Sequence, residues 1–360
     1  MSTNTSAQSP LWEAEPHTLA KHAILKKYLD AWAVIFSRTL NVTELLFYDG
    51  FAGPGEYTGG ELGSPIVALN ALLANTQSLK PIRLKFSELD EGRYNHLKAR
   101  LTVERANIPT GSRLIVDEPS LGDCTEQILK LVAERKVSRR PIGPALFFLD
   151  QFGYSQVPMT LIKEIMSHRY CEVFSYLNCQ RLIPYLTDES KAAGITNAFG
   201  DESWRAAGDA PDRQQAMIDL YKQALRTNGK VKYPWSFTMF DSDGHLIYWL
   251  VFSTNDLKGL EVMKKAMWRV DESGTYRFSD RNDPRQQRLF FSTLTDDWLA
   301  DELSKSLGGK KMSEDQVKEF VLTETPFYRY KDPINILRKR GIVTPTAKGK
   351  FPVTFATHNN

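Results

Sequence analysis

Four acidic residues stand at or just past the expected carboxyl ends of successive strands in this chain of 360 residues. They are Asp49, Glu88, Asp123 and Asp150. Open α/β sheets bind their ligands in the crevice at the carboxyl ends of their strands, so we expect these acids to face one polar ligand. After the second strand, Asp90 could face the ligand in place of Glu88. Each acid could instead serve the local backbone, and Asp123 is well placed to cap the helix that follows it.

A glycine-rich loop follows the first of these acids. Residues 50–63 include six glycines, whereas a strand-to-helix connection in an α/β fold usually needs about 2–6 residues. Asp49, Phe51, Gly53 and Gly55 match the D-x-F-x-G-x-G loop of enzymes that use S-adenosylmethionine (SAM). Thr58 stands where the dinucleotide fingerprint requires Gly or Ala, which disfavours an NAD-dependent oxidoreductase.

A SAM ligand would give each strand-end acid a distinct partner. Glu88, or Asp90 in its place, would accept hydrogen bonds from the two ribose hydroxyls. Asp123 would accept one from the adenine amine. SAM also carries an amino group and a sulfonium, which suit acidic neighbours such as Asp49.

The loop after the fourth strand is the expected catalytic segment. Enzymes that methylate the exocyclic amine of a base use Asp or Asn followed by Pro-Pro-aromatic at this point. Asp150 fits that pattern, but Gln151 replaces the first Pro and Gly153 replaces the aromatic residue. Phe152 or Tyr154 could stack on a base from a neighbouring position. Asp150 could equally cap the loop without any chemical role.

The elements that must position these residues are short apolar strands and amphipathic helices in alternation. We expect strands at 44–49, 83–88, 113–117, 145–150 and 171–177, with helices at 65–74, 91–106, 124–136 and 159–167. This alternation predicts an α/β, doubly wound, Rossmann-like sheet. A helix at 18–36 precedes it, a helical insertion occupies about 180–228, and strands at 235–240 and 246–252 form a C-terminal hairpin with Asp243 and Gly244 in its turn.

The domain organisation follows from these elements. Residues 1–16 are expected to form a flexible N-terminus, 17–272 the sheet domain and 290–356 a small winged-helix-like domain. Arg338, Lys339 and Arg340 lie together in the last helix of that domain and could contact the phosphates of RNA or DNA. The alternative is a solvated basic surface.

Composition narrows the class of protein. The net charge is only +3, so local patches rather than the whole chain would have to bind nucleic acid. No apolar run approaches the roughly 20 residues of a membrane span, and the polar N-terminus lacks the core of a signal peptide. The three cysteines have no metal-ligand spacing, so we expect no metal and a cytoplasmic location.

Several stretches together carry a resemblance to a known family. "PHTLAKHAILKKYL", "FYDGFAGPGEYTGGELGSPIVAL", "GDCTE", "LDQFG" and "YWLVFSTNDLKGLEVMKKAMW" resemble the three-Cys-motif partner protein family, over roughly His17 to Trp268. That resemblance implies a class I SAM-dependent methyltransferase-like fold. It also implies a partner, a protein of a neighbouring gene that bears a three-cysteine motif and resembles radical-SAM enzymes.

The first part is also similar to ribosomal RNA adenine-N6 methyltransferases. The matching residues are Lys21 and His22 ahead of the first strand and the loop from Asp49 to Tyr57, with Phe51 where the relatives have His. This similarity implies that Lys21 and His22 reach the cofactor or substrate. An isolated Lys-His pair would more simply lie on the solvated face of its helix.

Two interpretations remain open at this point. The first is a SAM-dependent methyltransferase that acts on nucleic acid together with the three-cysteine-motif protein. The second is a catalytically silent methyltransferase fold that binds this partner, which the departures at Gln151 and Gly153 favour.

Overall fold

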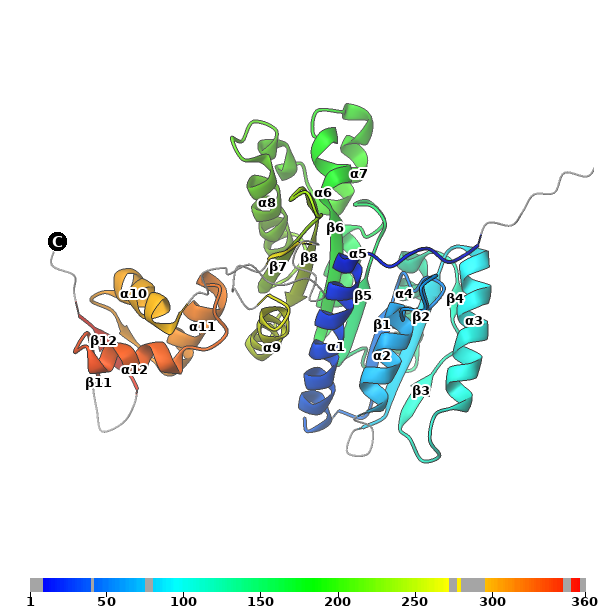
Figure 1. Cartoon of the computed structure of the whole chain (residues 1–360), viewed down its shortest axis with the longest axis horizontal. Coiled ribbons are helices and arrows are strands. Elements are labelled where there is room, and N and C mark those ends of the chain that lie inside the picture. The colour runs from blue at the N-terminus through cyan, green and yellow to red at the C-terminus, as the bar shows by residue number, and fades with distance from the viewer. Residues whose placement is uncertain are drawn as a thin grey trace, which may run out of the picture.

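The chain forms a large α/β domain followed by a small C-terminal domain (Figure 1). The computed structural model describes residues 9–39, 42–74, 80–271, 277–279, 295–345 and 351–356. Within these residues, no helix combines the length and the apolar character needed to cross a bilayer.

One mixed sheet organises the large domain. Its strand order is β3-β2-β1-β5-β6-β8-β7-β9, and β4 pairs with β2. The strands are β1 (Leu45–Asp49), β2 (Ile82–Glu88), β3 (Leu114–Val116), β4 (Ser120–Leu121), β5 (Ala145–Leu149), β6 (Cys171–Asn178), β7 (Tyr233–Phe240), β8 (Leu246–Thr254) and β9 (Arg277–Ser279). The strands from β3 to β6 are parallel, and β8 lies antiparallel between β6 and β7. The doubly wound, Rossmann-like sheet and its terminal hairpin are confirmed.

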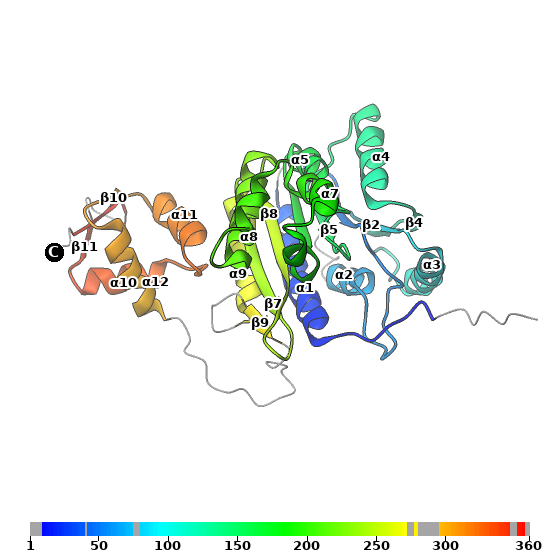
Figure 2. The ribbon, with the colours of Figure 1, turned by 90° about the horizontal axis from the view of Figure 1, so that it is seen from above.

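Helices cover both faces of this sheet (Figure 2). One face packs against α1 (Pro16–Ser37), α2 (Ser64–Leu73), α3 (Glu91–Ala106) and α9 (Leu257–Trp268). The other packs against α4 (Cys124–Val137), α5 (Met159–Met166), α7 (Glu189–Phe199) and α8 (Arg213–Thr227). Short helical turns, α6 (Cys179–Leu182), η2 (Ile183–Tyr185) and η3 (Ser203–Ala207), complete the helical region expected at about 180–228.

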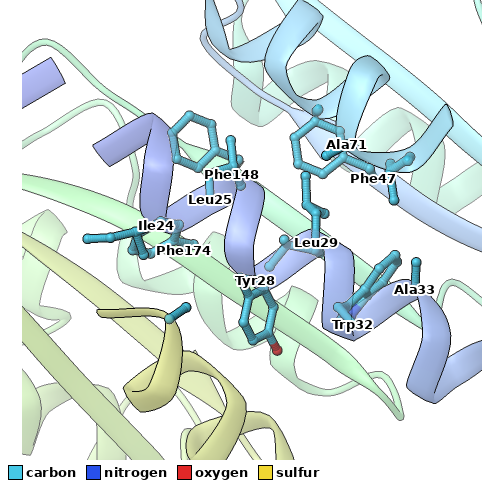
Figure 3. Packing of buried hydrophobic residues seen from close by; sticks show 14 of the residues in the cluster. Ile24, Leu25, Tyr28, Leu29, Trp32, Ala33, Phe47, Ala71, Phe148 and Phe174 are labelled. Atoms are coloured by element: carbon cyan, nitrogen blue, oxygen red, sulfur yellow. The ribbon is translucent and has the colours of Figure 1, made fainter. Parts of the chain in front are cut away.

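Helix α1 is held against the sheet by one apolar stripe. Leu25, Leu29 and Trp32 recur every three or four residues, and all are buried beside strand residues such as Phe47 and Phe148 (Figure 3). Full burial of each such side chain contributes about 1.5–3 kcal/mol. The stripe therefore fixes α1 firmly, and this positions its first turns at the carboxyl edge of the sheet.

Two strands of the large sheet were not expected from the sequence. Ser120–Leu121 form β4, a two-residue extension beside the end of β2. Residues 277–279, expected to lie in a linker, form β9 and pair with β7 in parallel, so the sheet domain extends beyond residue 272. Both segments are too short to produce a periodic pattern, which is why the hydrophobic pattern missed them.

The small domain combines three helices with a three-stranded antiparallel sheet. Its elements are α10 (Asp296–Leu307), β10 (Lys311–Met312), α11 (Glu314–Glu324), α12 (Lys331–Lys339), β11 (Val343–Pro345) and β12 (Val353–Phe355), and the sheet order is β10-β12-β11. The winged-helix assignment itself stays a prediction, and residues 346–350, where the wing would lie, are outside the described residues.

A buried lysine joins the two domains. The Lys264 ammonium on α9 is fully buried and donates to the carbonyls of Leu322 (2.9 Å) and Thr325 (2.6 Å) at the end of α11. It also lies 3.8 Å from the ring centroid of Trp235. Burial lowers the pKa of Lys264, and the two carbonyl oxygens compensate for part of the lost hydration.

Candidate functional site

The glycine-rich loop folds into a small hairpin that turns back over the end of β1. Glu56 and Leu62 form an antiparallel bridge, and the Gly63 N–H donates to the Gly55 carbonyl at 2.8 Å. Gly53 and Gly55 have φ values of +61° and +88°, which disfavour any residue with a side chain. The additional residues of this loop therefore form a folded hairpin that lines the crevice.

Glu88 holds this loop by its backbone. Its Oε2 accepts from the Gly53 N–H at 2.8 Å, while Oε1 accepts from the N–H groups of Leu89 (3.0 Å) and Asp90 (2.9 Å). The residue is 4% exposed. A carboxylate has about four acceptor positions, so three backbone donors leave little capacity for a ligand unless the Gly53 bond is exchanged.

A cavity of about 460 Å³ lies beside the carboxyl ends of β1, β5 and β6. Four predicted cofactor residues line it, namely Lys21, Phe51, Gly53 and Gly55. The predicted catalytic residues Asp150 and Phe152 line it as well. The structure thus brings together residues from the leading helix, the first loop and the loop after β5.

An ion pair and two aromatic rings form part of the cavity wall. The Lys21 ammonium donates to the Asp150 carboxylate, and their side chains are 7% and 20% exposed. The same ammonium lies 5.8 Å from the ring centroid of Tyr176 and 5.9 Å from that of Tyr248. The two rings are packed at 4.3 Å between centroids. Lys21 therefore points into the site, as the resemblance implied, and not to solvent.

The end of β6 supplies polar residues that sequence reasoning missed. Asn178 donates to the Tyr176 hydroxyl at 3.0 Å and accepts from the Arg181 N–H at 3.0 Å. The exposed Arg181 also lines the cavity. Asn178 ends β6 and Arg181 comes three residues later, so the same strand-end criterion, applied to the fifth expected strand, could have found them.

Two predicted residues lie buried behind the cavity wall. Burial raises the pKa of Asp49 to about 7, although the Ser64 hydroxyl and the Phe51 N–H oppose this by hydrogen bonding. Burial, with a smaller effect from the Lys21 charge, lowers the pKa of His22 to about 3. Neither side chain lines the cavity, so His22 is a neutral neighbour of the site.

The loop after β5 is fixed by Gln151 rather than by proline. The Gln151 amide donates to the Tyr176 carbonyl (3.0 Å) and accepts from the N–H groups of Gln156 (3.0 Å) and Val157 (3.1 Å). These three bonds give the loop one conformation. Tyr154 does not reach the cavity, because it packs near Tyr185 and the helix α7 side of the sheet. Its predicted catalytic role therefore has no geometric support.

Two of the predicted cofactor acids cap helices. Asp90 accepts from the Arg93 N–H at 2.8 Å and begins α3, and Asp123 accepts from the Glu126 N–H at 3.1 Å and begins α4. Neither lines the cavity. Large apolar side chains stand beside them: Leu89 is 62% and Leu121 45% exposed. Exposed leucines at two adjacent strand ends form a surface that could contact a planar base.

The segment before α1 lies across the carboxyl ends of the strands, toward α3 (Figure 1). The Trp12 carbonyl accepts a hydrogen bond from the Thr58 N–H at 2.9 Å. The centroid of the Trp12 ring lies 5.6 Å from that of Tyr57 and 6.3 Å from that of Phe152. The Arg93 guanidinium lies 5.1 Å from the Trp12 ring centroid. Residues 9–15 thus form an N-terminal strap that is held in place by these contacts. They belong to the segment 1–16 that was expected to be flexible, because its composition gives no sign of so distant a partner.

Comparison with known proteins gives remote similarities only. No family model and no curated protein matches the chain. Among solved structures it is similar to Trm1 from Pyrococcus horikoshii in complex with S-adenosyl-L-methionine, with 10% identity over 98% of this chain and 94% of that chain and a TM-score of 0.39. It is also similar to loganic acid methyltransferase with SAH, with 7% identity, 72% and 85% coverage and a TM-score of 0.24. The resemblance to the three-Cys-motif partner family stays a prediction.

Proposed function

We propose that this chain is a SAM-dependent methyltransferase. The observation that carries the proposal is the position of the cavity: it lies at the carboxyl edge of a doubly wound sheet, between the D-x-F-x-G-x-G loop and the paired Lys21 and Asp150. Ligand sites of such sheets lie at this edge. Both similar solved structures are described as complexes with SAM or SAH.

The residues around the cavity fit this cofactor. Gly53 allows a ligand to approach its backbone, because it carries no Cβ, whereas a Cβ at Gly55 would meet Leu97 and Ile66. Glu88 would accept from the ribose hydroxyls if its bond from the Gly53 N–H is exchanged, and the exposed Leu89 and Leu121 flank the proposed place of the adenine. The cofactor would supply an electrophilic methyl group. The contribution of the chain is to orient the acceptor and to hold its proton.

Asp150 is the residue that we assign to the acceptor. Its carboxylate faces the cavity and can accept a hydrogen bond from an amine or hydroxyl, while Lys21 orients it. Gln151 supports the assignment, since its three hydrogen bonds fix the loop that the expected prolines would otherwise stiffen. Tyr176 and Tyr248 offer aromatic surface for a planar acceptor.

We further propose that the acceptor is a nucleic acid and that the small domain contributes to its binding. The element order of that domain, helix-strand-helix-helix-strand-strand, supports a winged-helix assignment. Among the basic residues expected there, Arg340 is paired with Asp301 (2.6 Å) and Asp297 (2.7 Å). Its charge is therefore largely compensated, which weakens the contribution expected from Arg338, Lys339 and Arg340.

The alternative function is a silent binding module for the three-cysteine-motif protein. The observation in its favour is that Gln151 and Gly153 stand where enzymes that methylate an exocyclic amine have a proline and an aromatic residue. In that case the cavity would bind SAM but transfer no methyl group.

The deciding experiment pairs binding with turnover on one preparation. Calorimetric titration with SAM and SAH measures binding, and transfer from methyl-labelled SAM to cellular RNA, DNA and protein fractions measures turnover. Binding with transfer supports the methyltransferase, and binding without transfer to any fraction supports the binding module. Absence of heat and of thermal stabilisation at millimolar ligand refutes both.

A further inference from the structure

A second groove of about 440 Å³ lies between α1 and α9, outside the proposed active site. Four basic residues line it, namely Lys27 on α1 and Lys258, Lys265 and Arg269 on or just after α9. The acids in its wall are Asp30 and Glu261. None of these residues was identified from the sequence, because the basic residues come from segments more than 200 positions apart.

The acids of the groove are already paired with neighbours. Asp30 lies 3.6 Å from the Lys26 ammonium on the same helix. Glu261 lies 3.1 Å from Lys258 and 2.7 Å from Lys318 of α11. The negative charge in the wall is therefore compensated by residues other than Lys27, Lys265 and Arg269.

Three cations remain for an external partner. Across the part of the chain that the structure describes, Lys27, Lys265 and Arg269 make no ion pair with an acid, and all three are exposed. Lys258, Lys265 and Arg269 follow one another at intervals of seven and four residues, so they form a row on one face of α9. At 1.5 Å per residue this row is about 16 Å long.

The groove shares helix α1 with the proposed active site. Lys27 follows Lys21 by six residues, which is about 9 Å along the axis of α1. The rest of the groove is lined by apolar side chains, Ala31, Ile35, Val262 and Ala266. A chain of phosphates in the groove could contact several of these cations at once, as sequence-independent recognition of nucleic acids requires.

We propose that the α1/α9 groove binds the phosphate backbone of the nucleic acid that is methylated. This inference rests on the proposed function and specifies where its acceptor is held. It favours this groove over the basic cluster of α12, where Arg340 is neutralised by two aspartates.

The test compares two triple variants with the same loss of charge. The groove variant carries Lys27→Ala, Lys265→Ala and Arg269→Ala. The control variant carries alanine at the exposed Lys98, Lys130 and Lys136 of α3 and α4. Binding of a fluorescein-labelled single-stranded RNA and of the matching DNA is followed by fluorescence anisotropy over a series of KCl concentrations, and SAH titration checks the cofactor site of each protein.

The groove variant should bind nucleic acid more weakly, and the slope of log K against log salt should fall by about 2–3, one for each lost phosphate contact. The control should keep the wild-type slope, and both should keep wild-type SAH affinity. Equal losses in the two variants, no loss in the groove variant, or no nucleic-acid binding by the wild type would overturn the inference. So would a groove variant that keeps RNA affinity but loses a co-expressed protein partner.

Failure of SAH binding in the wild type would refute the proposed function instead, independently of the anisotropy result. If the triple groove variant does not fold, the single change Lys265→Glu decides the matter. A wild-type salt slope in that variant would count against the groove.

Discussion

Replacement of Glu88 by Gln should separate the two roles of this side chain, which are to hold the backbone of the loop and to bind the ribose of the cofactor. Its Oε1 accepts from two backbone N–H groups, of Leu89 and Asp90, whereas Oε2 accepts from one, that of Gly53. A glutamine has one carbonyl oxygen and one NH2 group. The orientation with fewer donor-to-donor conflicts keeps the oxygen toward Leu89 and Asp90 and turns the NH2 group toward Gly53.

The Gly53 N–H then loses its hydrogen-bond acceptor. The ribose hydroxyls of the cofactor lose a charged carboxylate oxygen as their acceptor. A hydrogen bond to a charged group contributes about 1.5–3 kcal/mol. Loss of one such bond to the cofactor should therefore raise the Kd for SAH by about 10- to 150-fold. The fold should persist, since Glu88→Gln preserves side-chain shape and two of the three backbone bonds.

The assay is calorimetric titration with SAH, with circular dichroism as the folding control. Glu91→Gln is the matched control variant. Glu91 lies three residues further on and is exposed, and its replacement by Gln removes the same charge. We expect Glu91→Gln to bind as the wild type does. A Kd for Glu88→Gln that equals the Glu91→Gln value would refute the reasoning and reduce Glu88 to a residue that only holds the loop.

Three further outcomes follow from the structure. Asp150→Asn should keep SAH affinity but lower methyl transfer by about 100-fold or more in a paired assay, because acceptor orientation is lost; equal loss of both would place Asp150 in cofactor binding. Burial raises the pKa of Glu172 to about 7, so its carboxyl stabilises the fold while protonated and loses that contribution as the pH rises from 4.5 through 7. Relative to Glu172→Gln, the wild type should lose about 3 kcal/mol of unfolding free energy over that range in urea titrations at several pH values, and parallel pH profiles would contradict this. Lys264→Met leaves two carbonyls at the end of α11 without a donor and should lower the free energy of unfolding by about 2–4 kcal/mol in calorimetric unfolding. The control Lys265→Met, at the exposed neighbouring position, should lower it little. Equal melting temperatures of the two variants would contradict the role of Lys264 as the link between the domains.

The elements of the sheet domain could be predicted well because their signals are local. Alternating apolar strands and amphipathic helices gave β1, β2, α3 and α4 nearly the bounds observed. The hairpin of β7 and β8 was predicted for the same reason, with Gly244 in its turn at a φ of +86°. Such patterns depend on residues a few positions apart, so a single sequence contains them.

The positions of the strand-end acids were also predictable, but their use was not. Asp90 and Asp123 cap helices, and Glu88 is occupied by three backbone donors. A sequence shows that an acid follows a strand, yet it cannot show which N–H groups the folded loops will bring to that acid. Only Asp150 of the four strand-end acids lines the cavity.

The sequence by itself therefore determined the fold class, the glycine loop and the edge of the sheet where the site lies. The tertiary structure alone decided which side chains meet there. Lys21 and Asp150 are 129 positions apart, and Trp12 of the N-terminal strap reaches Arg93 and Phe152 across the strand ends. These contacts depend on how α1 packs on the sheet and on the register of β1, β5 and β6. Packing and register are set by the whole buried core, and no local pattern encodes them.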